Sequence, residues 1–168
     1  MIRILIAAVF MVVVFSSCSH SYYIVRHAEK ATADNKNMSS DVPLTEQGNE
    51  RAEALKDVLR KEKIAFVFST NTIRTKSTAQ PTASLFQLPV TIYGPRPDSV
   101  FISLLTSVKK NTLIVGHSNT VDDVVNMLCK EKRIVADLPE TQYDNLFIVK
   151  KKGKNFILQQ KKYGRPSE

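Results

Sequence analysis

The feature that most constrains the fold is a set of short, nearly continuous apolar runs rich in branched and aromatic residues. They span residues 22–25, 64–68 and 112–115. Runs without polar alternation are typical of strands covered on both faces, as in the centre of a parallel sheet. The stretches between them carry apolar residues at helical spacing. Alternating strands and helices predict an α/β fold.

The helical stretches are 52–59, 100–108 and 121–128, each with one apolar stripe. Thr45 is expected to be the N-cap of the first. A further helix is expected over residues 72–86, where Pro81 should kink or split it.

The end of the chain changes character. Residues 145–149 and 155–158 flank Lys-Lys-Gly-Lys, which predicts a hairpin turning at Gly153. We therefore predict a three-layer α/β sandwich with a mostly parallel central sheet and an antiparallel C-terminal edge hairpin.

A single domain is expected over residues 18–168. The chain of 168 residues is 43% apolar and 24% charged, as in an ordinary folded domain. No repeat, low-complexity segment or linker interrupts it beyond residue 20. Its formal charge of +8 suits an anionic partner. The basic residues lack the aromatic interleaving of a stacking platform, so a nucleic-acid partner is not expected.

The first residues predict export. A short positive start precedes an apolar run over residues 4–15, and small residues follow it. That run is too short to span a bilayer comfortably but suits a signal peptide, here residues 1–17. The next residue resembles the lipidated cysteine of bacterial lipoproteins, which implies a lipid on Cys18 and attachment to a membrane of the bacterial cell envelope, on the periplasmic side or the cell surface. A plain secretory signal with an incidental Cys18 is the alternative. His20 is interpreted as linker.

Basic and imidazole side chains follow the predicted strands. In α/β sheets, ligands bind outside the carboxyl ends of the strands. The first run is followed by Arg26 and His27, and the run over 112–115 leads to His117, directly before a helix whose first amides could face an anion. The run ending at Phe68 leads to Arg74. Two histidines and two arginines are therefore expected to converge at one edge.

This set of groups suits phosphoryl transfer, in which positioned cations stabilise charge on the equatorial oxygens. Arginine binds phosphate bidentately and keeps its charge. Neighbouring guanidinium groups disfavour protonation of an imidazole, so a neutral His27 could attack phosphorus. We expect a covalent phosphohistidine at His27.

Four segments resemble the histidine phosphatase superfamily, also called phosphoglycerate-mutase-like. Arg26-His27-Ala28-Glu29 resembles its RHG or RHAE signature, and residues 43–52 resemble its LTxxGxxQA helix start. Residues 69–79 resemble its arginine segment, and residues 116–119 its second histidine motif. The segments occur in family order over roughly residues 22–150, a specific combination although each alone is weak.

The resemblance implies roles for particular residues. His27 would be the phosphorylated nucleophile, and Arg26, Arg74, His117 and Ser118 would bind the phosphate. It also implies a phosphatase that needs no metal or other cofactor. The chain is too short for the extra segments of true mutases, and it is more similar to compact phosphatases such as phosphohistidine phosphatases.

The general acid is the open point. Most members use a carboxylic acid from the region between the second arginine and the second histidine. Asp98 is the acidic residue in that interval, but it also stands where a helix begins and could be its N-cap. Glu29 is the competitor, although it could instead orient an arginine. If neither serves, substrates with good leaving groups, such as phosphohistidine or acyl phosphates, would be favoured.

The expected function is hydrolysis of a phosphomonoester or phosphoramidate through a phosphohistidine on His27. The substrate would be a small phosphorylated compound or a phosphorylated peptide. The alternative is a lipoprotein that holds a phosphorylated ligand in the same pocket without turning it over.

Overall fold

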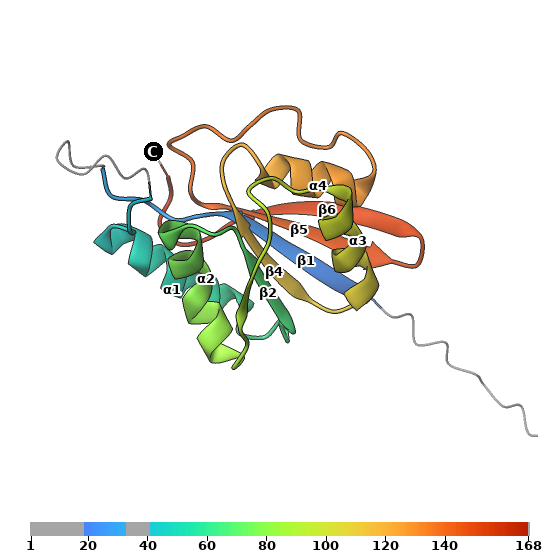
Figure 1. Ribbon diagram of the computed structural model, residues 1–168, viewed down its shortest axis with the longest axis horizontal. Coiled ribbons are helices and arrows are strands. Elements are labelled where there is room, and N and C mark those ends of the chain that lie inside the picture. The colour runs from blue at the N-terminus through green and yellow to red at the C-terminus, as the bar shows by residue number, and fades with distance from the viewer. Residues whose placement is uncertain (1–18, 33–40, 168) are drawn as a thin grey trace, which may run out of the picture.

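A six-stranded mixed sheet forms the centre of the molecule in this computed structural model, which describes residues 19–32 and 41–167 (Figure 1). The strands are β1 (Ser19–Arg26), β2 (Phe66–Ser69), β3 (Val90–Ile92), β4 (Thr112–Gly116), β5 (Asn145–Lys152) and β6 (Asn155–Lys162). Their order across the sheet is β3-β2-β4-β1-β5-β6. The first four are mutually parallel, whereas β5 runs antiparallel to β1 and β6 antiparallel to β5.

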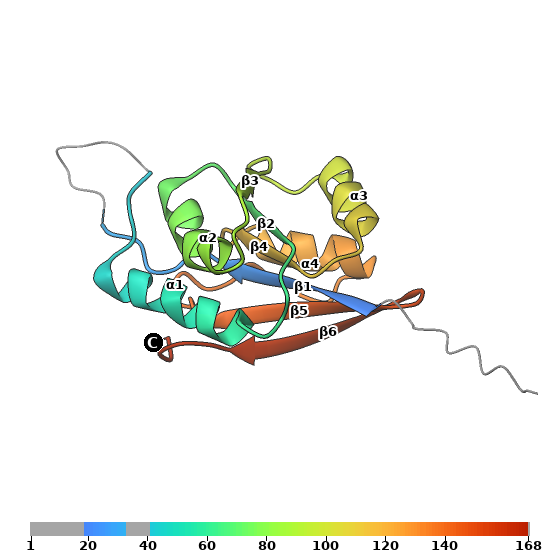
Figure 2. The same ribbon diagram turned by 90° about the horizontal axis from the view of Figure 1, so that it is seen from below.

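Four helices cover the two faces of this sheet. They are α1 (Glu46–Leu59), α2 (Ile73–Leu85), α3 (Ser99–Val108) and α4 (Val121–Cys129). Apolar residues of α1 and α2 pack into one buried cluster with the sheet, and those of α3 and α4 pack into another. Figures 1 and 2 show this arrangement. The predicted three-layer sandwich, with its parallel centre and antiparallel C-terminal hairpin, is confirmed.

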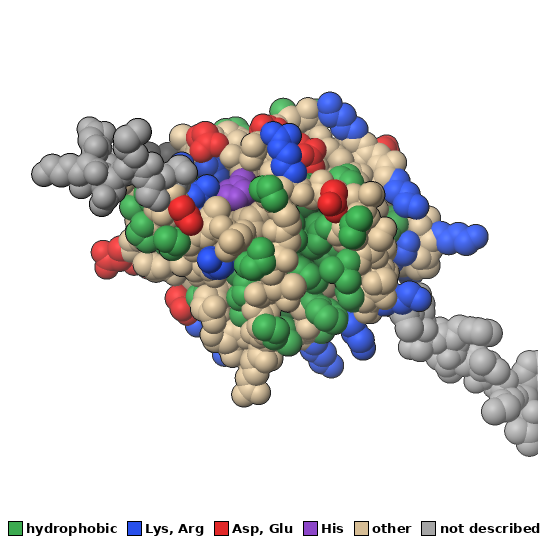
Figure 3. Space-filling view, viewed as in Figure 1, with side chains coloured by type: hydrophobic (Ala, Val, Ile, Leu, Met, Phe, Trp, Pro, Cys, Tyr) green, Lys and Arg blue, Asp and Glu red, His purple; other side chains and the backbone are tan. Residues whose placement is uncertain are grey.

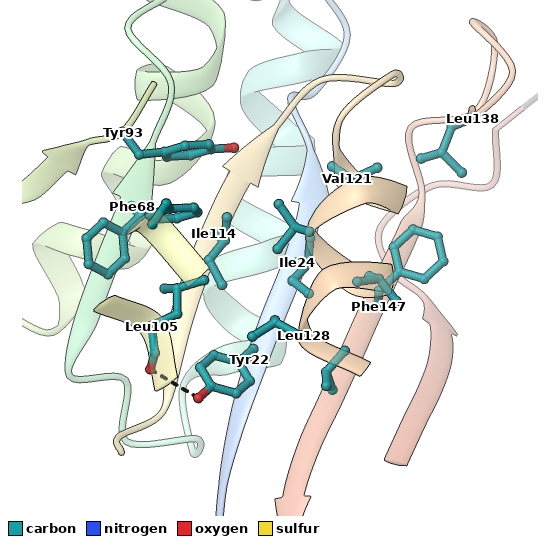
Figure 4. Packing of buried hydrophobic residues seen from close by; sticks show 14 residues of the cluster. Tyr22, Ile24, Phe68, Tyr93, Leu105, Ile114, Val121, Leu128, Leu138 and Phe147 are labelled. Carbon is teal, nitrogen blue, oxygen red and sulfur yellow. Dashed lines mark hydrogen bonds between the residues drawn. The ribbon is translucent and has the colours of Figure 1, made fainter. Parts of the chain in front are cut away.

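Burial of both faces of β1 explains why its sequence is almost continuously apolar. Tyr22 and Ile24 point into the cluster under α3 and α4, while Tyr23 and Val25 point into the cluster under α1 and α2. The Tyr22 hydroxyl donates a hydrogen bond to the Leu105 carbonyl at 3.0 Å (Figure 4). Both faces are therefore buried, as expected for a central strand.

The interpretation of His20 as linker is wrong. His20 belongs to β1 and is buried, and its Nε2 lies 2.9 Å from the Tyr22 hydroxyl. Hydrogen bonding to β5 extends the strand beyond its apolar run, so polar residues are included.

The start of α1 is packed against the chain just after β1. Thr45 caps the helix as predicted, its hydroxyl accepting from the Gly48 amide at 3.0 Å, and its own amide donates to the Glu29 carbonyl. A Cβ atom on Gly48 would stand 2.2 Å from that carbonyl oxygen. Glycine is therefore required at this contact.

Two local expectations differ from the structure. Of the two outcomes expected at Pro81, a kink or a split, the split is wrong, because helix α2 continues through this residue. Strand β3 was not predicted, because it is short and largely exposed and so lacks an apolar run.

The predicted signal peptide and lipid on Cys18 lie outside the described residues, so both stay predictions. Among residues 19–32 and 41–167, no helix is long and apolar enough to cross a membrane.

Candidate active site

The two histidines lie side by side because they follow neighbouring parallel strands. Arg26 at the end of β1 is in register with Gly116 at the end of β4. The amide of His27 continues this pairing by donating to the Gly116 carbonyl at 2.9 Å. The rings of His27 and His117 are 5.5 Å apart between centroids.

Arg74 reaches the same edge from the other neighbour of β4. Strand β2 pairs with β4, and the loop after it leads into α2, whose N-cap is Thr72. Arg74 stands in the first turn of α2, and its guanidinium lies 3.6 Å from the Asp41 carboxylate.

These side chains surround one cleft of about 530 Å³. Histidine atoms reach the molecular surface in Figure 3, with basic side chains beside them. The cleft is lined by His27, Lys30, Arg74, Pro95, Arg96, His117, Ser118, Asn119, Thr120, Asp137, Leu138 and Glu140. Four of the predicted site residues, His27, Arg74, His117 and Ser118, are thus brought together.

The protonation of His27 follows from its contacts. Its Nδ1 lies 2.7 Å from the Ala28 carbonyl oxygen, which only accepts, so Nδ1 carries the proton and the lone pair is on Nε2. His27 is 3% exposed. Burial, assisted by the charges of Arg26 and Arg74, lowers the pKa of His27 to about 3, although the Ala28 bond acts in the opposite direction. The ring is therefore neutral at physiological pH.

His117 is also neutral. Burial is the main cause, and Arg74 and Arg26 add to it, lowering the pKa of His117 to about 4. Its Nε2 lies 2.9 Å from the Thr70 hydroxyl, which holds the ring in place.

A buried threonine connects the histidine loop to the arginine helix. Thr78 accepts a hydrogen bond from the Ala28 amide at 2.9 Å and donates one to the Arg74 carbonyl at 2.8 Å. Sequence reasoning did not assign it a role. It couples the position of His27 to that of Arg74.

Arg26 does not line the cleft directly. It is 1% exposed, and its guanidinium stacks 4.2 Å from the centre of the Tyr143 ring. One terminal nitrogen donates to the carbonyls of Pro139, Glu140 and Gln142, at 3.0, 2.9 and 3.3 Å. The other donates to the Glu140 carboxylate at 2.6 Å.

Glu140 is the site residue that sequence reasoning missed. One carboxylate oxygen accepts from Arg26, and the other accepts from the Ser118 hydroxyl at 2.6 Å. These contacts lower the pKa of Glu140, the Ser118 bond having the largest effect. The Glu140 carboxylate thus accepts hydrogen bonds from Arg26 and Ser118, two residues that the sequence predicts to bind phosphate. A search between Arg74 and His117 could not find it, because it lies in a loop after α4.

The two acids proposed from the sequence lie elsewhere. Asp98 is the N-cap of α3, accepting from the Phe101 amide at 2.8 Å, and it is not among the residues lining the cleft. Glu29 binds Arg51 through both carboxylate oxygens, with contacts of 2.6 to 2.9 Å. Neither acid lines the described cleft that contains His27. Their catalytic roles stay predictions, and the structure does not favour them.

Within residues 19–32 and 41–167 no three His, Cys, Asp or Glu side chains form a group that could hold a metal ion. Lys30, Arg74 and Arg96 are the lysine and arginine side chains that line the described cleft.

Comparison with known proteins points to one superfamily. The family model of the histidine phosphatase superfamily (branch 1) matches residues 22–94. None of the curated proteins compared with the chain matches it significantly.

Solved structures share the fold at low sequence identity. One is assigned as a phosphohistidine phosphatase, SixA, from Agrobacterium tumefaciens; it is 21% identical, with a TM-score of 0.61 over 87% of this chain and 98% of that one. The protein histidine phosphatase SixA in complex with tungstate is 19% identical, with a TM-score of 0.66 over 84% and 96%. A mycobacterial glucosyl-3-phosphoglycerate phosphatase is 13% identical, with a TM-score of 0.60 over 86% and 98%. Residues 22–94 thus match the histidine phosphatase superfamily model, and the chain shares its fold with solved phosphatases of that kind.

Proposed function

We propose that this protein is a phosphatase that transfers the phosphoryl group of its substrate to Nε2 of His27 and then to water. The observation that carries the proposal is the position of the His27 ring, which lies in one cleft with Arg74 and His117 and turns its Nδ1 to the Ala28 carbonyl. The bound tungstate of one SixA structure, a tetrahedral oxyanion, is consistent with an anion site in this fold.

The reaction has two displacements. In the first, the Nε2 lone pair of His27 attacks phosphorus, and the bond to the leaving oxygen or nitrogen breaks with its electron pair. In the second, water attacks the phosphohistidine, the P–N bond breaks and its electron pair returns to Nε2, releasing inorganic phosphate and a proton. Arg74 supplies positive charge to the equatorial oxygens in both steps.

The preferred substrates have good leaving groups. Glu140 and Asp137 are the carboxylates lining the described cleft, and the contacts of Glu140 favour its ionised form. An ionised carboxylate donates no proton to a leaving group. Phosphoramidates such as phosphohistidine, and acyl phosphates, need less help than alkyl phosphates. The likeness in fold to phosphohistidine phosphatases supports the same preference.

In this proposal Glu140 accepts the hydrogen bonds from Arg26 and Ser118 that the substrate phosphate takes over when it binds. Its side chain is 71% exposed although it binds buried Arg26, so it can swing into solvent without disturbing the core. An entering phosphate then accepts the same bonds from Arg26 and Ser118.

A panel of substrates tests this function. Acetyl phosphate, a phosphoramidate, an aryl phosphate and glycerol phosphate would be offered to the full chain and to His27→Asn. We expect kcat/KM on glycerol phosphate to be about 100-fold or more below that on acetyl phosphate. The variant should be inactive, and acid-labile phosphate should be trapped on His27 of the parent. Equal rates on both compounds would contradict the leaving-group preference alone.

A non-catalytic phospho-ligand-binding lipoprotein is the second candidate. It is favoured by the position of Asp98, which caps a helix instead of lining the cleft. The panel separates the two, because a binding protein gives neither product nor adduct.

We also propose lipid attachment at Cys18, on the strength of the apolar run and small residues before it. In the native host, Cys18→Ser should move the protein from the membrane to the soluble fraction. Unchanged membrane association would contradict this.

A further inference from the structure

A group of basic side chains lies at the end of the sheet opposite the catalytic cleft. Lys130, Arg133, Lys151 and Lys154 surround a pocket of about 620 Å³, and we call these four residues the basic cluster. None of them contributes to the proposed catalytic site. Their positions therefore call for a separate explanation.

The basic cluster is assembled where three elements meet. Lys130 follows the last residue of α4, Lys151 lies near the end of β5, and Lys154 lies in the turn between β5 and β6. The first residues of β1 pair with this hairpin, Ser19 with Lys152. Figures 1 and 2 both show the start of β1 beside the tip of the hairpin. In Figure 3 basic side chains gather along that edge of the molecule.

The positive charge of the basic cluster is largely uncompensated. Arg133 pairs with Glu131 at 2.8 Å, but the other three make no ion pair with any described residue. Lys151 is held against the Phe156 ring, 3.8 Å from its centre. Its charge reaches the buried ring of His20, where burial first and Lys151 second lower the pKa.

The order of the chain indicates which anionic partner this surface meets. Only residues 16–18 separate the apolar run over 4–15 from the start of β1. The membrane anchor would be either the apolar run itself or a lipid on Cys18, and both are attached to the domain beside the basic cluster. A bilayer that holds this anchor would face Lys130, Lys151 and Lys154. Each basic side chain near an anionic bilayer strengthens binding about fivefold.

We propose that the basic cluster binds anionic phospholipid head groups and docks this end of the domain on the membrane. His27 lies at the other end of β1, about 25 Å away for eight extended residues. The catalytic cleft then opens away from the bilayer, towards substrates dissolved in water. This orientation is independent of the reaction at His27.

Amine labelling of the full chain tests the proposal. The protein would be bound to vesicles of zwitterionic lipid, with or without phosphatidylglycerol, and the acylation rate of each lysine measured by mass spectrometry. We expect Lys130, Lys151 and Lys154 to be protected at least fivefold in the anionic vesicles alone, and high salt to remove the protection. Lys76 and Lys161, at the catalytic end, should react equally in both.

A pair of charge variants provides the matched control. Lys130→Glu/Lys154→Glu should abolish the protection of Lys151, whereas Lys76→Glu/Lys161→Glu, with the same change in charge, should leave it intact. Equal labelling of Lys151 in the two vesicle types would overturn the proposal. So would protection of Lys151 by inorganic phosphate without vesicles, which would show that the pocket binds a solute.

Discussion

Replacing Glu140 by glutamine should make the protein bind phosphate more tightly. The carboxylate accepts from Arg26 and Ser118, so an entering phosphate has to displace it. Glutamine keeps the size of the side chain but removes its charge. Phosphate then competes with a weaker acceptor for the hydrogen bonds of Arg26 and Ser118.

The magnitude can be worked from exposure. Because the Glu140 side chain is 71% exposed, its ion pair with Arg26 is worth no more than about 1 kcal/mol. Repulsion between the carboxylate and a phosphate about 4 Å away in water contributes about 1 kcal/mol per unit charge. Together they predict a gain of about 1–2 kcal/mol, or roughly 5- to 30-fold in affinity.

The assay is inhibition by inorganic phosphate, measured against an aryl phosphate for the parent chain, Glu140→Gln and Asp137→Asn. Asp137 also lines the described cleft but makes no hydrogen bond with Arg26 or Ser118, so its variant corrects for a general change in charge. We expect the inhibition constant to fall 5- to 30-fold in Glu140→Gln, less in Asp137→Asn, and the difference to shrink at high salt. A large fall in kcat with unchanged phosphate affinity would refute this reasoning, since Glu140 would then act on the reacting atoms.

Three further predictions concern the support of the site. Thr78→Val should lower the free energy of unfolding by about 1–3 kcal/mol and reduce kcat, because it leaves a buried amide without its acceptor, while Thr78→Ser should retain both. Gly48→Ala should cost about 1–3 kcal/mol in thermal or urea unfolding by forcing apart α1 and the Glu29 carbonyl, whereas the exposed neighbour variant Asn49→Ala should be nearly neutral. The pKa of His27 is depressed in the folded state, so the unfolded chain binds more protons below pH 6.5 and the free energy of unfolding falls with acidification. Between pH 7 and 4.5, the parent should lose roughly 2–3 kcal/mol more of this free energy than His27→Asn, as measured by urea unfolding. Equal losses would contradict a buried neutral imidazole.

Much of the fold was predictable from local pattern. The run from Tyr22 to Val25 is apolar on both faces because β1 is covered on both sides, and that property is visible in sequence. Strand β3 left no such signal, since an exposed edge strand of three residues needs no apolar run. His20 was misread because hydrogen bonds to β5, and not its own hydropathy, place it in a strand.

The residues of the site also divide into those that local pattern predicts and those that tertiary contacts place. The carboxyl ends of neighbouring parallel strands meet at one edge, so the sequence by itself determined that His27 and His117 would lie together, with Arg74 beside them. Tertiary structure alone decided the partners of Arg26, the coupling through Thr78 and the position of Glu140. These contacts join residues 22 to 114 positions apart in the chain, and no local pattern specifies which loop will close over a given strand end.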